Sequence, residues 1–519
     1  MNNNNFKSLN SEFTKIQNFY QTQNYEEVIS RSKILIKKYP EAIPLYNALG
    51  LAHLQKGEYN FALKSLQEAL KINSKDSNVL CNLGLVSKAQ KNNLLAEHYY
   101  KKAIDLNPNH FIALLNYGNL KNDLYDINSS LELYLKALKL KPDVAEIHIN
   151  LAKIYNSIGN FEYCKKHCLL LNDKFPEHTI ADQMLVEIID YKVDQSHQEQ
   201  MLKKLSNQMI NNSNLIILNF SIAKSYEKQE RFDKSIFYLD IANNLKKKIN
   251  HNYNINNDVL FFSKVIKIFN SKNKSLNLIE PISDKKFIFI VGLPRSGTTL
   301  LHQILSKSSS VAGVGELSFF DTPITKLIEK IDFDADFEDA LKLIKTSFLS
   351  KISEFDFNQD IIVEKTPHNF IWLGFLKKMF PNSKIIHSKR DIKDTAFSNY
   401  KHLFLSNNYN WAYNKDDLTR YINEYLKIMD FWTKKFGIQI FHNNYHDLIA
   451  NPIEQTKKIF NYCDLDWNSE CLNIESSKAK IDTLSFAQAR RPIYKGAIDF
   501  YKNYESLSDL FDKVNNSIK

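Results

Sequence analysis

Residues 285–305 read KKFIFIVGLPRSGTTLLHQIL, and the order of residue types in this segment predicts an α/β domain. Residues 287–291 form an apolar run with the length of a buried strand, and residues 292–299 form a glycine-containing turn. From Leu300 onward the apolar residues recur at helical spacing. A strand, a turn and a helix in this order place backbone N–H groups and a helix dipole where they can hold a phosphate.

The turn lacks the lysine that loops for nucleoside triphosphates carry. In their pattern G-x-x-x-x-G-K-[ST] the lysine reaches the terminal phosphates, whereas here Gly292 and Gly297 are followed by Thr298. Arg295 and Ser296 supply a positive charge and a hydroxyl within the turn instead. This composition favours a 5′-phosphate that carries a transferable group over ATP hydrolysis. A nucleotide kinase or NTPase is the first alternative.

The segment GLPRSGTT (292–299) resembles the 5′-phosphosulfate loop of the sulfotransferase family, whose donor is 3′-phosphoadenosine 5′-phosphosulfate. The resemblance implies that this loop binds the phosphosulfate of the donor. The residues it assigns to that role are Arg295, Ser296, Gly297, Thr298 and Thr299.

A second segment, KIIHSKRDIKDTAFSNYKHLF (384–404), has the order strand, arginine, helix. Residues 384–387 read as a strand, and Arg390 follows at the carboxyl end, where open α/β sheets place ligands. Ser398 lies about two helical turns further on. In the sulfotransferase family such an arginine and serine meet the 3′-phosphate, so the resemblance assigns Arg390 and Ser398 to it. Ile392 stands where the family more often has proline.

A third segment, TLSFAQARRPIYKGAIDFYKNYE (483–505), resembles the loop that covers the nucleotide in bacterial-type and tyrosylprotein-type sulfotransferases. Arg490, Arg491 and Lys495 form a compact cationic group within it. Arginine suits a phosphate because its planar fork donates two parallel hydrogen bonds. We expect this group to contribute to nucleotide binding.

Sulfuryl transfer needs a base for the acceptor proton and a donor or cation at the bridging oxygen that leaves. Glu316 follows Gly313 and Gly315, and the resemblance to tyrosylprotein-type enzymes implies that it is the base. His387 and His402 are the rival candidates, because cytosolic-type members of the family use a histidine.

The resemblance also assigns Lys365, in EKTP, and Ser485, in TLSFAQ, to stabilisation of the leaving group. It implies that Tyr445 packs on or bonds to the nucleotide. We expect no metal ion in the mechanism, because arginine, lysine and backbone amides neutralise the charge.

The N-terminal half repeats with a period of 34 residues. Gly50, Gly84 and Gly118 are spaced by 34, and small residues and prolines keep the same register. This period is that of a helix-turn-helix unit that stacks on its neighbours. The segment NALGLAHLQKGEYNFALKSLQEALKINSKD (47–76) resembles the tetratricopeptide repeat (TPR) family. A degenerate unit recurs at Ala223, Ser235 and Ala242.

The predicted fold is α plus α/β. An N-terminal α-solenoid of TPR helical hairpins over residues 9–250 precedes a linker over 251–284, which also includes a connecting helix. A sulfotransferase domain follows over 285–519, a three-layer, P-loop-like α/β domain with a parallel sheet. Two further segments in that domain, 361–367 and 438–452, read as strand then turn.

Composition narrows the class of protein. The net charge is +10, but the lysines are scattered without a dense basic block, so we expect an anionic small molecule and no nucleic acid. Five cysteines in a large chain suit a reducing compartment. Cys164 and Cys168 flank His167 within a repeat helix and lack a second ligand pair, so no metal site is expected. No apolar run is long enough for a membrane span, and the default location is the cytoplasm.

The sequence therefore predicts a sulfotransferase that acts on a hydroxyl acceptor, with a tyrosine of a protein or peptide as one candidate. Glycans, lipids and small hydroxyl compounds stay open as acceptors. The TPR array is expected to bind a protein or peptide, either a partner or the acceptor. A TPR scaffold with an inactive nucleotide-binding domain is the second alternative.

Overall fold

A computed structural model describes residues 3–206, 210–270, 285–330, 336–355, 357–404, 406–474 and 498–516. The chain divides into two compact units, Met1–Ile154 and Tyr155–Lys519. Among the helices in these ranges, none has both the length and the apolar character that crossing a bilayer requires.

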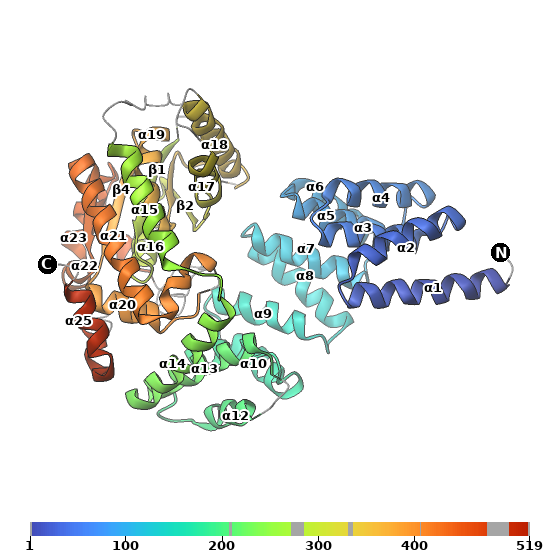
Figure 1. The fold of residues 1–519 in the computed structure, drawn as a ribbon, viewed down its shortest axis with the longest axis horizontal. Coiled ribbons are helices and arrows are strands. Elements are labelled where there is room, and N and C mark those ends of the chain that lie inside the picture. Colours follow the sequence, from blue (N-terminus) through green and yellow to red (C-terminus); the bar gives the residue numbers. More distant parts are fainter. Residues whose placement is uncertain are drawn as a thin grey trace. The chain divides into compact units, whose positions relative to one another are not determined.

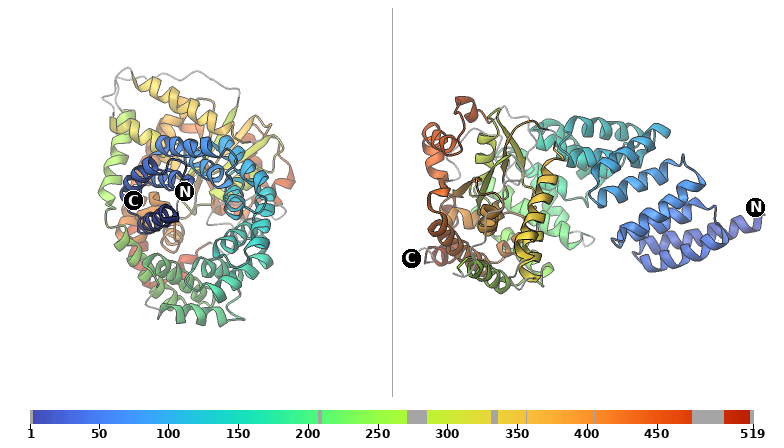
Figure 2. Two further views of the ribbon diagram at one scale, coloured as in Figure 1. Left: turned by 90° about the vertical axis from the view of Figure 1, so that its right-hand side faces the viewer. Right: turned by 90° about the horizontal axis from the view of Figure 1, so that it is seen from above.

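The first unit consists of paired helices (Figures 1 and 2). Polar side chains begin many of them: the carboxylate of Asp76 accepts hydrogen bonds from the N–H groups of Asn78 and Val79, which have no partner within the helix. The helices of the unit are α1 (Asn3–Gln21), α2 (Tyr25–Lys38), α3 (Ile43–Gln55), α4 (Tyr59–Ile72), α5 (Ser77–Ala89), α6 (Asn93–Leu106), α7 (Phe111–Asp123), α8 (Ile127–Leu140) and α9 (Ala145–Ser157), the last of which spans the boundary.

The repeated glycines lie where two helices of one hairpin meet. A Cβ on Gly84 would lie 2.5 Å from Tyr100 Cε1, and one on Gly118 would lie 2.6 Å from Tyr134 Cε1. Both tyrosines are buried and follow their glycine by the same interval. The 34-residue spacing thus reflects a packing contact between the two helices of a hairpin.

Gly118→Ala is therefore expected to lower the free energy of unfolding by about 1–3 kcal/mol, because the added methyl group overpacks the contact with Tyr134. Denaturant unfolding of the full chain measures it. The next unit carries Ala152 together with the smaller Cys168, so the same change should cost less in a Tyr134→Cys background. An equal cost in both backgrounds would contradict the packing argument.

The second unit starts with further helices and confirms the helical pair expected around residues 223–242. Ala223, Ser235 and Ala242 are buried in two adjacent helices. Cys164 and Cys168 are buried on one helix with their sulfur atoms 4.0 Å apart. The helices of this part are α10 (Phe161–Lys174), α11 (Ile180–Ile188), α12 (Ser196–Leu205), α13 (Asn212–Lys228) and α14 (Phe232–Ile249).

Five described strands form one parallel sheet in the order β2-β3-β1-β4-β5 (Figure 1), which confirms the predicted parallel α/β architecture. Alternate residues of β1 point to opposite faces: Phe287 and Phe289 join one apolar core, and Ile288 and Ile290 join the other. The strands are β1 (Lys286–Gly292), β2 (Val311–Gly315), β3 (Ile361–Glu364), β4 (Lys384–Lys389) and β5 (Ile440–Asn444).

Helices cover both faces of this sheet and make three layers. The helices that line the core around Phe289 include α15 (Ile255–Asn270), α17 (Asp321–Lys330), α18 (Asp336–Ile352), α19 (Leu373–Met379), α20 (Ile392–Tyr400), α21 (Lys415–Phe436) and α25 (Ser508–Asn516). The core around Ile290 is lined by α16 (Thr298–Leu305), α22 (Tyr445–Ala450) and α23 (Pro452–Tyr462).

Helix α15 occupies most of the described part of the expected linker. Phe262, Val265 and Phe269 are buried in the core of the second unit, and the Phe269 ring lies 5.1 Å from that of Trp432. The residues before the sheet thus pack as part of this unit. The hairpin of α13 and α14 contacts α20 in the same unit: Asn243 Nδ2 donates a hydrogen bond to Tyr400 O at 3.0 Å.

Candidate functional site

The turn after β1 has two residues in the left-handed region of backbone conformation. Arg295 and Gly297 have positive φ values of 69° and 100°. A Cβ on Gly297 would lie 2.5 Å from Tyr445 Cδ2, so the tyrosine ring packs directly on the loop. Thr298 and Thr299 are buried and begin α16, whose N-terminus favours negative charge.

Three side-chain hydrogen bonds hold the loop in this shape. Ser296 Oγ donates to Leu293 O at 2.7 Å, and Ser388 Oγ, from β4, donates to Ser296 O at 2.8 Å. Asn399 Nδ2, from α20, donates to Pro294 O at 3.0 Å. A loop fixed in this way pays little entropy on binding an anion.

Two of the predicted anion ligands meet around the loop although 103 residues separate them. Arg295 Nε donates to Ser398 Oγ at 3.2 Å. Arg390 Nη1 donates to Arg295 O at 3.2 Å, and its guanidinium carbon lies 5.3 Å from the Tyr445 ring centroid. The structure therefore brings Arg295, Arg390, Ser398 and Tyr445 together at the carboxyl ends of β1 and β4, where α/β sheets bind ligands.

The proposed base and cation are also neighbours. The Lys365 ammonium donates to the Glu316 carboxylate, and the backbone N–H of Lys365 donates to Gly315 O at 2.8 Å. The Lys365 side chain is 1% exposed and that of Glu316 is 31% exposed. The Glu316 carboxylate is thus partly exposed to solvent, whereas the Lys365 ammonium is buried.

His302, for which no role was predicted, supports the strand that leads to Glu316. Its Nε2 accepts a hydrogen bond from Gly315 N at 3.2 Å, and a Cβ on Gly313 would lie 2.8 Å from the same nitrogen. Burial, and then the nearby Lys365 ammonium, lower the pKa of His302 to about 3. A neutral ring is required here because a protonated Nε2 could not accept this bond.

Glu364 is a second residue whose role the sequence did not indicate. It precedes Lys365, but its carboxylate bonds to the Thr366 hydroxyl, to Asn369 Nδ2 at 2.8 Å and to Leu317 N at 3.3 Å. Burial raises the pKa of Glu364 to about 7. The hydrogen bonds of Glu364 fix the segments on either side of the Glu316–Lys365 pair. Its position directly before Lys365 is the feature of the sequence that could have indicated this role.

The two rival bases are engaged elsewhere. His387 is buried in β4, where its ring nitrogens contact the Tyr425 hydroxyl at 2.5 Å and His442 Nδ1 at 2.9 Å. His402 Nδ1 contacts Ser398 O at 2.6 Å. Burial is the main cause that holds the pKa of each well below the usual value. Both rings have structural partners, and this favours Glu316.

Four predicted site residues lie outside the described residues, in the segment 475–497: Ser485, Arg490, Arg491 and Lys495. Directly after that segment the chain returns to α20. The backbone N–H of Asp499 donates to Asp394 Oδ2 at 2.9 Å, and that of Tyr501 donates to Asp394 Oδ1 at 3.4 Å. These bonds attach the C-terminal residues to the helix that carries Ser398.

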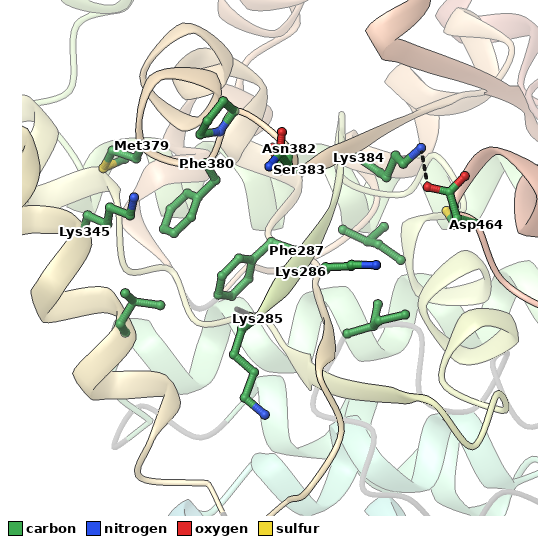
Figure 3. A pocket seen from close by; sticks show the side chains of 15 residues that line it. Lys285, Lys286, Phe287, Lys345, Met379, Phe380, Asn382, Ser383, Lys384 and Asp464 are labelled. Carbon is green, nitrogen blue, oxygen red and sulfur yellow. Dashed lines mark ion pairs between the residues drawn. The ribbon is translucent and has the colours of Figure 1, made fainter. Parts of the chain in front are cut away.

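A pocket of about 430 Å³ lies at the amino ends of the central strands (Figure 3). Lys286 and Phe287 at the start of β1 and Lys384 at the start of β4 line it, and Lys384 pairs with Asp464 at 2.8 Å. Since the strands are parallel, their amino ends lie away from the loop, and the pocket is not part of the candidate site. Within the described ranges, no group of three or more His, Cys, Asp or Glu side chains is arranged to hold a metal ion.

Comparison with known proteins finds different relatives for the N-terminal and C-terminal parts of the chain. Residues 288–469 match the sequence model of the sulfotransferase family, and residues 50–91 and 77–110 match tetratricopeptide repeat models. The chain is 29% identical over 373 residues to an uncharacterized protein of Aquifex aeolicus (strain VF5), which covers 68% of this chain and 48% of that protein. The chain thus spans about half the length of this relative.

A second relative is named "Putative protein-tyrosine sulfotransferase" in Caenorhabditis briggsae. It is 25% identical over 197 residues, 36% of this chain and 69% of the relative. A solved structure of Pseudomonas aeruginosa pilF is 20% identical with a TM-score of 0.32, over 38% of this chain and 90% of that chain. The chain therefore combines tetratricopeptide repeats in its N-terminal half with a sulfotransferase-family region over residues 288–469.

Proposed function

We propose that this chain transfers a sulfuryl group from 3′-phosphoadenosine 5′-phosphosulfate to a hydroxyl group, and that the acceptor is a tyrosine of a protein or peptide. The observation that carries the proposal is the convergence of Arg295, Ser398 and Arg390 on one preformed loop. The similarity to a relative named as a putative protein-tyrosine sulfotransferase supports this acceptor class.

The residues of the loop suit a donor with two anionic groups. The side chain of Arg295, the N-terminus of α16 and the Thr298 and Thr299 hydroxyls would hold the 5′-phosphosulfate, and the Ser296 hydroxyl would have to release Leu293 O to join them. Arg390 and Ser398 would hold the 3′-phosphate, and Tyr445 would pack on the nucleotide. A Cβ on Gly297 would collide with the Tyr445 ring, so this position accommodates only glycine without rearrangement.

The Glu316–Lys365 pair would carry the chemistry. The donor supplies an activated sulfuryl group; a bond from the acceptor oxygen to sulfur forms as the bond from sulfur to the bridging oxygen breaks. Glu316 takes the acceptor proton, and Lys365 stabilises the charge that develops on the leaving oxygen. The ammonium has three N–H donors, so it can hold Glu316 and a substrate oxygen together.

Arg295→Ala tests the donor site. It is expected to weaken binding of adenosine 3′,5′-bisphosphate by about 1.5–3 kcal/mol for each charge-assisted hydrogen bond lost. Calorimetric titration of the full chain measures the dissociation constant. Arg420→Ala is the control, because this exposed arginine bonds to Asn256 on the surface. Unchanged affinity in Arg295→Ala would reject the proposed role of the loop, and preferential binding of ATP–Mg²⁺ would favour a kinase or NTPase.

The repeats would recruit a protein or peptide, either the acceptor or a partner. Tetratricopeptide repeats expose a broad surface on which another chain can lie. Transfer of labelled sulfate to tyrosine-containing peptides, with serine or phenylalanine replacements as controls, tests the acceptor class. Labelling that persists without the tyrosine would reject it.

A further inference from the structure

The pocket at the amino ends of β1 and β4 has the dimensions of a ligand site. Its volume of about 430 Å³ lies within the range of small-molecule sites, roughly 300–1,000 Å³. It begins at the start of β1, whereas the candidate donor site around Arg295 follows the other end of this strand. The pocket is therefore a cavity separate from the donor site.

One half of the pocket is apolar. The buried rings of Phe287 and Phe380 have their centroids 4.8 Å apart, and Met379, also buried, lies beside Phe380 (Figure 3). Because residues alternate along a strand, Phe287 points to the face of the sheet opposite that of Ile288. This half suits the apolar part of a ligand, which gains free energy by leaving water.

The other half carries charged groups on one face of the sheet. Lys286 lies two residues before Ile288 in β1, and Lys384 of β4 is the register partner of Ile288. Residues at these positions point to the same face, so both lysine side chains share the face of Ile288. Figure 3 shows the two lysines on one side of the pocket and the Phe380 ring on the other.

The charges in this half favour an anion. Lys286 is exposed, and Lys384 Nζ pairs with Asp464 at 2.8 Å through side chains that are 31% and 71% exposed. An exposed ion pair contributes little to stability, so a ligand anion can bind to Lys384 as well. Burial raises the pKa of Cys463, which also lines the pocket, to about 12, so its thiol adds no negative charge.

Ser383 adds a hydroxyl from the turn between Phe380 and Lys384. Its side chain lines the pocket and is 5% exposed, and its Oγ has no hydrogen-bond partner among the residues that the structure describes. The backbone of this residue is fixed: Ser383 N donates to Phe380 O at 2.9 Å, and Lys377 Nζ donates to Ser383 O at 3.0 Å. A buried hydroxyl without a partner is unfavourable, so a ligand oxygen that accepts its hydrogen bond would be stabilised.

We propose that this pocket is a second ligand site, which binds a small organic anion with an apolar body. The body would pack on Phe287 and Phe380. The anionic group would accept hydrogen bonds from Ser383 Oγ and from the ammonium groups of Lys286 and Lys384. The inference does not rest on the proposed function, because none of these residues takes part in donor binding or in sulfuryl transfer.

Calorimetric titration of the full chain with 2-naphthoate measures this binding. Two matched probes separate the contributions: 2-naphthamide keeps the rings without the charge, and acetate keeps the charge without the rings. We expect saturable binding of one naphthoate per chain, tighter than that of naphthamide by about tenfold or more, and no saturable binding of acetate. Equal affinity for naphthoate and naphthamide, or no saturable binding of naphthoate, would overturn the inference.

A double variant, Lys286→Met with Lys384→Met, removes both ammonium groups and keeps most of the side-chain length. It should bind naphthoate about as weakly as naphthamide, a loss of about tenfold or more, while the affinity for naphthamide stays unchanged. Lys458→Met is the control, because Lys458 pairs with Glu454 on the surface. A preference for naphthoate that persists in the double variant would reject the role of the lysines.

Ser383→Ala tests the hydroxyl. It should lower the affinity for naphthoate about tenfold without lowering the thermal midpoint, since the hydroxyl that it removes has no partner in the described part of the chain. Ser87→Ala is the control: the hydroxyl of this buried serine donates to Leu83 O at 2.8 Å within the repeats, and naphthoate affinity should not change. Unchanged naphthoate affinity in Ser383→Ala would show that the hydroxyl does not contact the ligand.

Arg295→Ala distinguishes the pocket from the donor site. Because the two lie at opposite ends of β1, this change should lower the affinity for adenosine 3′,5′-bisphosphate and leave that for naphthoate unchanged. If naphthoate affinity falls in Arg295→Ala and not in the lysine double variant, the probe binds beside Arg295 and the inference is wrong. A chain that binds naphthoate through the two lysines but does not bind the bisphosphate retains this inference and refutes only the proposed function.

Discussion

Replacing Lys365 with methionine is expected to lower the rate of sulfuryl transfer by on the order of 100-fold or more, as removal of one oxyanion donor does in other enzymes. The Lys365 side chain is almost fully buried, and its ammonium lies against Glu316 at the carboxyl ends of β2 and β3. A charge acts strongly in such a setting because little water screens it. The single-turnover rate at saturating donor is the quantity to measure.

The control for this change is Lys351→Met, which removes a partly exposed lysine that pairs with Glu354. It should leave the rate unchanged. Methionine keeps most of the length of the lysine side chain, and the carboxylate it leaves behind is partly exposed and can be hydrated. The thermal midpoint therefore separates a folding defect from a chemical one. A folded Lys365→Met protein with the wild-type rate would remove Lys365 from the mechanism.

Glu316→Gln is expected to lower turnover by roughly 100-fold or more, because the acceptor hydroxyl loses its general base. The amide keeps the shape of the side chain and can still accept a hydrogen bond from Lys365. Donor affinity should be nearly unchanged, because Arg295 and Arg390 bond to other groups. Turnover and bisphosphate affinity, measured on the same preparation, show whether the two quantities separate.

Glu424→Gln is the matched control, because Glu424 is a glutamate on α21 that pairs with a surface lysine. It should retain turnover. If Glu316→Gln also retains turnover, the base lies elsewhere, and His402→Gln becomes the next variant to measure. A loss of bisphosphate affinity equal to the loss of turnover would instead assign Glu316 to donor binding.

The sequence predicted the buried strands well because a strand covered on both faces is apolar throughout. The run 287–291 became β1, and residues 384–387 became most of β4. Strand β2 was missed, since VAGVG contains two glycines and resembles a turn. The reason for Gly313 is tertiary: His302 and Ser306 leave no room for a Cβ at that position.

In the candidate site, too, the sequence identified some residues, and only the tertiary structure showed how they are arranged. Arg295 and Ser398 were proposed from two separate motifs, and the structure places them in direct contact. No role was predicted for Glu364, and the structure shows that its carboxylate bonds to Thr366, Asn369 and Leu317. Which of two adjacent residues faces the site depends on how β3 meets β2, and no local pattern encodes that.

The amino-acid order alone was sufficient for the 34-residue helical repeat, the strand–turn–helix around residues 286–305 and the succession of the two parts. These features follow from interactions between residues close together in the chain, whose periodicity is visible in the letters. The tertiary structure alone decided that Glu316 pairs with Lys365, that His302 must be neutral, and that Glu227 on α13 bonds to Lys401. Such contacts join residues up to 174 positions apart, and their burial and charge depend on the packing of whole helices and strands around them.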